Sequence, residues 1–159
     1  MSILAIDPGI STAGWALYIP ATHKIQYGQI NTNASDNKYV RTNKIVDGLK
    51  QLSDGRQINL VVMEDFNIYK KGRERIGTVI RKAVVLCVVG ALQEAFRGRR
   101  LEIVLNRTWE PKWNKGIPGA PYVACLPEHA RDAAKMLIAQ CSDVIGPLNT
   151  IRLERIKCK

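Results

Sequence analysis

Four side chains with the chemistry of metal ligands are spread over three separate parts of the chain: Asp7, Glu64, His129 and Asp132. Carboxylate oxygens are the ligands that hard divalent cations such as Mg²⁺ prefer, and imidazole is better suited to Mn²⁺ and softer ions. Two such ions held about 4 Å apart activate a water molecule and stabilise the leaving oxygen of a phosphodiester. If the fold gathers these side chains, they predict metal-assisted hydrolysis of a phosphodiester bond.

Each of these residues also has a purely structural interpretation. Asp7 precedes Pro8-Gly9 and suits an Asx-type turn, and Glu64 suits a solvated strand end. Asp132 is placed to balance a helix dipole, and His129 can occupy a first helical turn without binding anything. The structural interpretation suffices for any one of them, but the occurrence of all four in a strongly basic chain favours the metal site.

The predicted elements bring these residues together. Residues 2–7 and 59–65 are nearly continuous apolar runs, which are typical of strands buried on both faces. Both runs end on carboxylates, and as neighbouring strands they would place Asp7 and Glu64 at one edge of a sheet. Residues 127–142 are predicted to form a helix with Pro127 at its start. On that helix His129 and Asp132, three residues apart, project from the same face.

The other elements complete an α/β chain. The order of strands and helices predicts a mixed five-stranded sheet flanked by helices, in a single domain over residues 1–159 with a basic tail at about 151–159. The first three strands are predicted to form an antiparallel meander. A helix over 36–52 has Val40, Ile45, Val46 and Leu49 facing inward. The further predicted elements are strands at 14–19, 24–30 and 101–105, a helix at about 73–96 and an irregular segment at 107–126.

The net charge of the chain indicates which class of partner it binds. Lys and Arg number 24 against 14 Asp and Glu, a net charge of +10. A domain this basic typically binds a polyanion, most commonly nucleic acid, the alternative being a solvated basic surface without a partner. The apolar stretch 3–6 is too short for a signal peptide or a membrane span, and the scattered cysteines are typical of reduced thiols. We therefore expect an intracellular protein of the cytoplasm or nucleoid. An organelle or a virus-infected host cell is the alternative location.

The long helix predicted at about 73–96 is apolar around most of its circumference, since residues 83–95 are AVVLCVVGALQEA. A surface helix needs only one apolar stripe. We therefore expect this helix to be covered on two sides, by the sheet and by either a third helix or a second copy of the chain. A homodimer is the favoured interpretation.

Three motifs, in order along the chain, resemble those of one known family. They are Ile6-Asp7-Pro8-Gly9 followed by Gly14-Trp15-Ala16-Leu17, then Val62-Met63-Glu64-Asp65-Phe66, and finally His129-Ala130-Arg131-Asp132-Ala133-Ala134. Together they resemble the RuvC-type Holliday junction resolvases, over residues 3–139. The resemblance implies a ribonuclease-H-like fold and a homodimer that nicks four-way DNA junctions symmetrically, using Mg²⁺ or Mn²⁺ at two positions per active site.

The resemblance also assigns roles to individual residues. Asp7, Glu64 and Asp132 match the metal-binding carboxylates. His129 stands where many family members have a further aspartate, and histidine at this position also occurs in the RuvC-like domains of CRISPR effector nucleases. Lys112 matches a loop lysine that stabilises the attacked phosphate, with Lys115 as the second choice. The family usually has a further helix before the closing one, for which residues 116–126 are too short and too rich in proline.

Basic and aromatic residues beside the second motif are the candidate DNA contacts. Cations here would contact phosphates without reading sequence, and the aromatic rings would stack on unpaired bases. Phe66 has packing in the core as its alternative, and Trp109 and Trp113 serve either as a DNA platform or as anchors of their segment. The predicted DNA-binding residues are Phe66, Tyr69, Lys70, Lys71, Arg73, Arg75 and Lys115.

The predicted function is therefore structure-selective cleavage of four-way junctions by a metal-dependent endonuclease without a covalent intermediate. The alternative within the same fold is a nuclease for flaps, forks, other branched DNA or RNA–DNA hybrids. A DNA-binding module without catalysis is a third interpretation. An actin-like ATPase also opens with a DxG turn, but it requires a second lobe for which the chain has no room.

Overall fold

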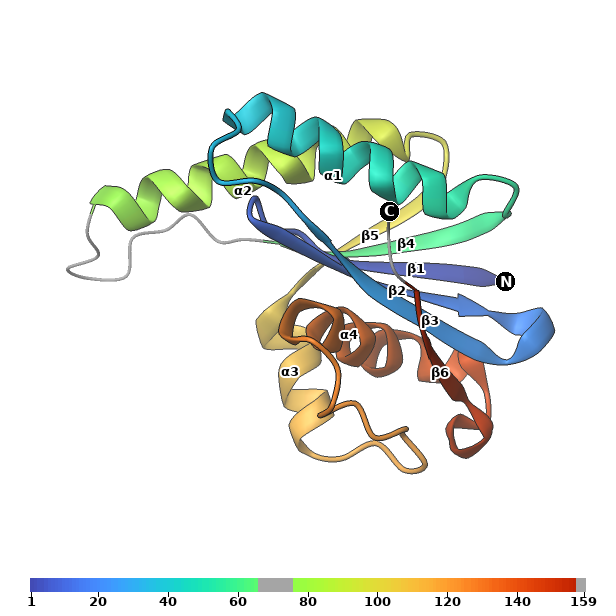
Figure 1. Ribbon diagram of the computed structural model, residues 1–159. Helices are drawn as coiled ribbons and strands as arrows, with labels where there is room; N and C mark the ends of the chain where they lie inside the picture. The colour runs from blue at the N-terminus through green and yellow to red at the C-terminus, as the bar shows by residue number, and fades with distance from the viewer. Residues whose placement is uncertain (66–75, 157–159) are drawn as a thin grey trace.

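Nearly continuous apolar runs form the centre of a mixed β-sheet in the computed structural model, which describes residues 1–65 and 76–156. Strands β1 (Ser2–Asp7) and β4 (Ile58–Asp65) lie side by side at this centre. The described sheet has six strands in the order β5-β4-β1-β2-β3-β6 (Figure 1). The remaining strands are β2 (Thr12–Ile19), β3 (Lys24–Asn31), β5 (Arg100–Leu105) and β6 (Arg152–Arg155).

The pairing of the strands fixes where the first two carboxylates lie. β1, β2 and β3 form the predicted antiparallel meander, and β4 and β5 continue the sheet parallel to β1. Ile6 of β1 pairs with Met63 of β4. The residues that follow them, Asp7 and Glu64, therefore reach the same edge of the sheet, as the sequence predicts.

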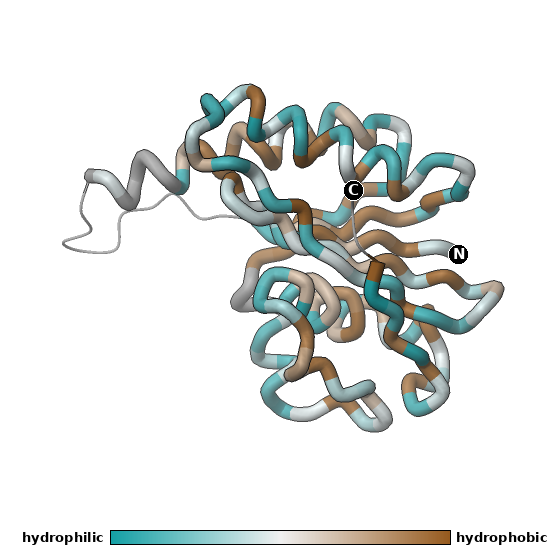
Figure 2. Tube along the Cα trace, in the orientation of Figure 1, coloured by the Kyte–Doolittle hydropathy of each residue, from teal (hydrophilic) through white to brown (hydrophobic). Residues whose placement is uncertain are grey.

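In the described part of the chain, two α-helices cover each face of the sheet (Figure 1). Helices α1 (Lys38–Ser53) and α2 (Ile76–Ala95) lie on one face, and α3 (Asn106–Asn114) and α4 (Glu128–Ile145) lie on the other. Figure 2 shows that hydrophobic residues are concentrated in the strands between these two layers. No helix among residues 1–65 and 76–156 is long and apolar enough to cross a lipid bilayer.

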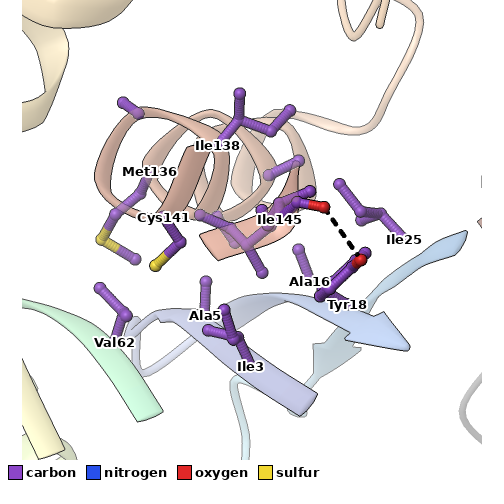
Figure 3. Close-up of a cluster of buried hydrophobic side chains, with 14 of the residues drawn as sticks. Ile3, Ala5, Ala16, Tyr18, Ile25, Val62, Met136, Ile138, Cys141 and Ile145 are labelled. Carbon is purple, nitrogen blue, oxygen red and sulfur yellow. Dashed lines mark hydrogen bonds between the residues drawn. The ribbon is translucent and has the colours of Figure 1, made fainter. Parts of the chain in front are cut away.

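Helix α4 packs against the middle of the sheet through small side chains. Ala130, Ala133 and Ala134 are completely buried, so the helix lies close to the strands. Figure 3 shows the core between α4 and the sheet, in which the Tyr18 hydroxyl of β2 donates a hydrogen bond of 3.1 Å to the carbonyl of Ile145. This bond fixes the C-terminal end of α4 against the meander.

Two elements differ from the sequence prediction. Arg152–Arg155, part of the predicted basic tail, forms β6 and pairs in parallel with β3, so the sheet has six strands and not five. Its two exposed arginines flank two half-buried residues at a sheet edge, where charged side chains are common, and a basic composition therefore concealed the strand. The predicted irregular segment begins with helix α3, which contains Pro111 in its interior although proline supplies no backbone N–H to a helix.

The inward face of α1 also needs correction. In α1, Ile45 and Leu49 are buried as predicted, but Val40 is 48% exposed because it lies in the first turn, beyond the edge of the core. The buried residues of α2 pack against both the sheet and α1, whereas Ala83 and Cys87 are exposed. Coverage of this exposed part by a second copy of the chain stays a prediction.

Gly14 of β2 determines how closely α4 approaches the sheet. It pairs with Asp7 across the β1–β2 ladder, and a Cβ atom at this position would overlap the backbone carbonyl of His129 at the start of α4. The lack of a side chain therefore lets the first turn of α4 lie against β2, next to Asp7. Close approach of another backbone is one of the established reasons for glycine within a strand.

The substitution Gly14→Ala should destabilise the protein by about 1–3 kcal/mol, the usual cost of forcing extra atoms into a packed site. The free energy of unfolding in urea measures this. The matched control is Gly90→Ala in α2, where a Cβ meets no atom within 4 Å. The control should gain up to about 1 kcal/mol from helix propensity. A Gly14→Ala protein as stable as the wild type would contradict the close contact.

Candidate active site

Asp7 is the buried carboxylate around which the candidate site is built. Strand β1 carries it to the sheet edge, where it is only 5% exposed. Its Oδ2 atom lies 2.7 Å from Nδ1 of His129, in the first turn of α4. A buried carboxylate costs free energy unless it is hydrogen-bonded or paired with a cation, and the imidazole ring meets that need.

Glu64 of β4 is close enough to two other carboxylates for its ionisation to be suppressed. Burial raises the pKa of Glu64 to about 8, together with the charge of Asp7, a hydrogen bond to Asp7 and the charge of Asp132. The indole N–H of Trp109 acts in the opposite direction and lowers this pKa, although its Nε1 makes no hydrogen bond of ordinary geometry. Carboxylates from β1, β4 and α4 thus share one electrostatic environment.

His129 is more basic than an ordinary histidine. Its hydrogen bond to Asp7 raises the pKa of His129 above the usual value, and partial burial opposes this rise. The negative charges of Asp7, Glu128 and Asp132 add to the increase. Near neutral pH the imidazole therefore carries a larger share of positive charge than an isolated histidine, and this charge partly balances the carboxylates.

Asp132 lies one turn beyond His129 on α4, as the spacing predicts, and it has cationic neighbours. Its Oδ1 atom lies 3.4 Å from Nζ of Lys135 and 3.9 Å from Nε of Arg131. These side chains are partly exposed, so the ion pairs contribute little to stability. Arg131 lies within the third motif, but Lys135 lies just beyond it. The one available signal was the spacing of three residues between Asp132 and Lys135 on a helix.

The side chains of this cluster are of the types that bind divalent cations, but their present arrangement does not form a binding site for one. Among residues 1–65 and 76–156, no group of three or more His, Cys, Asp or Glu side chains is arranged to hold a metal ion. Asp7 is instead hydrogen-bonded to His129. Burial and the neighbouring carboxylates raise the pKa of Glu64, and a bound cation reverses such an effect. Cation binding therefore requires these donors to turn away from one another.

The predicted lysines at α3 lie away from this cluster, whereas Trp109 of α3 lies next to Glu64. Nζ of Lys112 donates a 2.9 Å hydrogen bond to Oε1 of Gln140. Gln140 stands two turns beyond Asp132, about 12 Å along α4, so the structure does not gather Lys112 with the carboxylates. Lys115 is the exposed residue that ends α3. Trp109 is only 5% exposed and belongs to the core, which matches the role of an anchor.

The remaining predicted DNA contacts lie outside the residues that the structure describes. They follow Glu64 directly in the sequence, so they stay predictions. They are Phe66, Tyr69, Lys70, Lys71, Arg73 and Arg75.

Comparison with curated proteins relates the sequence to one protein. The crossover junction endodeoxyribonuclease RuvC of Ehrlichia canis is 33% identical over 94 residues. This match covers 58% of the present chain and 60% of the relative, so the aligned part spans less than two thirds of RuvC. No protein-family model matches the chain.

Solved structures extend the likeness to the fold. The chain aligns with Thermus thermophilus RuvC in complex with a Holliday junction substrate at a TM-score of 0.64 and 18% identity, over 87% of this chain and 91% of that one. The chain has the ribonuclease-H-like fold of RuvC. A second T. thermophilus RuvC structure gives a TM-score of 0.58 at 16% identity, over 87% and 92% of the two chains.

A third structural neighbour is the yeast mitochondrial Holliday junction resolvase Ydc2. It gives a TM-score of 0.50 at 12% identity and covers 98% of this chain and 65% of the neighbour. The predicted fold class and the resemblance to RuvC-type resolvases are both confirmed.

The ionisation of Glu64 predicts how the stability of the protein depends on pH without metal ions. The folded protein keeps a proton on Glu64 between the ordinary value of 4.5 and about 8, whereas the unfolded chain loses it. The free energy of unfolding should therefore fall as the pH rises through this range. The raised pKa of His129 acts in the same direction.

The melting temperature measured in EDTA at a series of pH values tests this. The matched variant Glu64→Gln cannot titrate at this position, so it should show a smaller fall. Identical pH profiles for the variant and the wild type would contradict the suppressed ionisation.

Proposed function

We propose that the chain is a metal-dependent endonuclease that resolves four-way DNA junctions by hydrolysing phosphodiester bonds. The observation that carries this proposal is the shared environment of Asp7, Glu64 and Asp132, in which burial, then Asp7 and Asp132, raise the pKa of Glu64 to about 8. Such a cluster of acids on a chain of net charge +10 suits a cation bound between protein and a phosphate backbone. The likeness to RuvC supports junction DNA as the substrate.

Mg²⁺ or Mn²⁺, with two ions per site, is the proposed cofactor, and Asp7, Glu64, His129 and Asp132 are the proposed ligands. Such ions, when bound, lower the pKa of water and offset negative charge on the phosphodiester. The imidazole of His129 favours Mn²⁺ over Mg²⁺. An intracellular location, in the cytoplasm or nucleoid, is proposed with this substrate.

The residues of the chain itself prepare the site. Glu64 holds a proton near neutral pH that must leave when it becomes a ligand, so cation binding should release protons. Burial of Asp7 keeps the cluster in a medium where charge interactions are strong. Lys112 remains the lysine proposed to offset charge on the attacked phosphate, which requires its ammonium group to exchange Gln140 for the phosphate. The predicted contacts within residues 66–75 are proposed to position the DNA.

The substitution Asp7→Asn should reduce cleavage of labelled four-way junctions by at least about 100-fold, the scale of losing one group that stabilises a transition state electrostatically. It should leave the Kd for the junction within a few-fold of the wild type, because phosphate contacts supply most of the affinity. Asp54→Asn, at an exposed position after α1, is the matched control and should cleave normally. Cleavage by Asp7→Asn at the wild-type rate, in either metal ion, would rule out the site.

A panel of substrates separates the proposed function from its alternatives. We expect the wild-type protein to cleave a four-way junction faster than a Y-fork, a flap, a linear duplex or an RNA–DNA hybrid, and to stop when EDTA is added. Faster cleavage of another member of the panel would support the nuclease activity but overturn the four-way junction as the substrate. Binding without cleavage in both metal ions would favour the non-catalytic DNA-binding module.

A homodimer is proposed because α2 leaves a stripe of small side chains uncovered. Ala83, Cys87 and Gly90 are exposed in the described chain and recur at positions i, i+4 and i+7, on one face of the helix. Small side chains allow another helix to approach closely. A second copy of the chain, placing its own α2 against this one, would cover the stripe.

The substitution Gly90→Arg tests this interface. A side chain at Gly90 meets nothing within 4 Å in the single chain, so the variant should fold normally. It should shift the molecular mass in multi-angle light scattering from dimer to monomer, while Gly90→Ala stays dimeric. A Gly90→Arg dimer, or a monomeric wild type, would contradict the proposed interface.

A further inference from the structure

The face of α4 next to Asp132 continues into a pocket of about 580 Å³. Its walls are the end of α3, the segment that follows α3 and the first two turns of α4, and they include Trp113, Ile117, Tyr122, Arg131 and Lys135. This volume falls within the range of pockets that hold small organic ligands. None of the roles assigned above makes use of it.

Two cations connect this pocket to the candidate active site. Lys135 and Arg131 line the pocket, and the same two side chains approach Oδ1 of Asp132 at 3.4 Å and 3.9 Å. A molecule in the pocket would therefore lie beside one of the proposed metal ligands. The pocket is a lateral extension of the site and not a separate cavity elsewhere on the protein.

The charges of the pocket favour an anion. Arg131 and Lys135 are the charged residues of its lining, which contains no carboxylate. The side chain of Arg131 is 32% exposed, so part of it is open to a ligand. A guanidinium group matches the oxygens of a phosphate. A phosphate group is the anion that fits these two cations.

The pocket also carries the aromatic rings that bind nucleobases. Tyr122 is 77% exposed on the segment between α3 and α4, where its ring is open to a partner. Trp113 is partly buried against the core, and Val123 at 3% exposure gives the pocket a rigid floor. Aromatic rings next to a positively charged groove are the combination by which proteins bind single-stranded nucleic acid.

We propose that this pocket binds one unpaired nucleotide of the strand that is cleaved, with its base stacked on Tyr122 and its phosphate contacting Arg131 and Lys135. The proposal rests on the proposed nuclease function, because it places the strand next to Asp132. A nucleotide within DNA is favoured over a free nucleotide because the two cations that line the pocket also border the cleavage site. The role of Tyr122 is to position the strand.

Binding of a four-way junction tests the base contact, measured by fluorescence anisotropy with proteins that also carry Asp7→Asn to prevent cleavage. Tyr122→Ala should raise the Kd by about 5-fold to 150-fold, the range that stacking of one base supplies. Tyr122→Phe keeps the ring and should bind as the wild type does. The matched control is Tyr39→Ala, because Tyr39 is 69% exposed on α1, on the opposite face of the sheet.

A junction that lacks one base identifies the nucleotide in the pocket. Single abasic sites are placed in turn at each position around the cleaved bond. At one position the loss should weaken binding to the wild type and have little further effect on Tyr122→Ala, because both changes remove the same contact. Independent effects at every position would overturn the stacking contact.

The phosphate contact is tested by the salt dependence of the Kd. Lys135→Met should lower the slope of log Kd against log salt by about 0.7–0.9, the value for one phosphate contact. The matched control is Lys50→Met, an exposed lysine in the last turn of α1, which should leave the slope unchanged. An unchanged slope for Lys135→Met would overturn the phosphate contact.

Failure of this proposal can be distinguished from failure of the proposed function. If the wild type cleaves junctions and Tyr122→Ala binds them equally well, the pocket is wrong and the nuclease stands. If the wild type cleaves nothing, binding of single-stranded oligothymidylate still decides the pocket, which is overturned if Tyr122→Ala has no effect. Tighter binding of thymidine monophosphate than of the oligonucleotide would overturn the assignment to a DNA strand.

Discussion

The hydrogen bond between Asp7 and His129 connects the first strand of the sheet to the helix that closes the site, and the candidate active site depends on it. Asp7 is buried at the end of an apolar strand, where an unpaired carboxylate would cost several kcal/mol. The imidazole partner comes from a residue 122 positions later. Because β1 and β4 are parallel neighbours, the same edge also receives Glu64. Burial and the charges of Asp7 and Asp132 together suppress the ionisation of Glu64 at this edge.

The elements with long, regular patterns could be predicted from the sequence, and the irregular ones could not. β1, β4 and α4 are recognisable because their burial is nearly continuous or strongly periodic. β6 was concealed because an edge strand buries little and Arg152 resembles a solvated tail. α3 was concealed by Pro111, because a proline inside a segment argues against a helix there. Val40 was wrongly predicted to face inward, because the helical period of apolar residues does not show where the core ends.

The site was predictable to the same extent. The ends of two buried strands and a spacing of three residues on a helix were sufficient to group Asp7, Glu64, His129 and Asp132. Contacts that depend on tertiary packing were not predictable. The hydrogen bond from Lys112 to Gln140 and the approach of Lys135 to Asp132 depend on how α3 and α4 pack, which no local pattern encodes. Gly14 illustrates the difference. The sequence shows that a glycine stands in the first motif, but only the structure shows that a side chain there would overlap the backbone of His129.

The position of β6 has a consequence for the way the chain assembles. Tyr18 and His23 hold the end of α4 and the turn after it through the carbonyls of Ile145 and Pro147, and the chain then returns along β3. The outer edge of β3 therefore stays unpaired until the last described strand arrives. Contacts between segments so distant in sequence form slowly. During synthesis, or after proteolytic loss of these residues, β3 would offer a bare template to strands of other molecules. A segment that resembles a dispensable tail thus protects the sheet against aggregation.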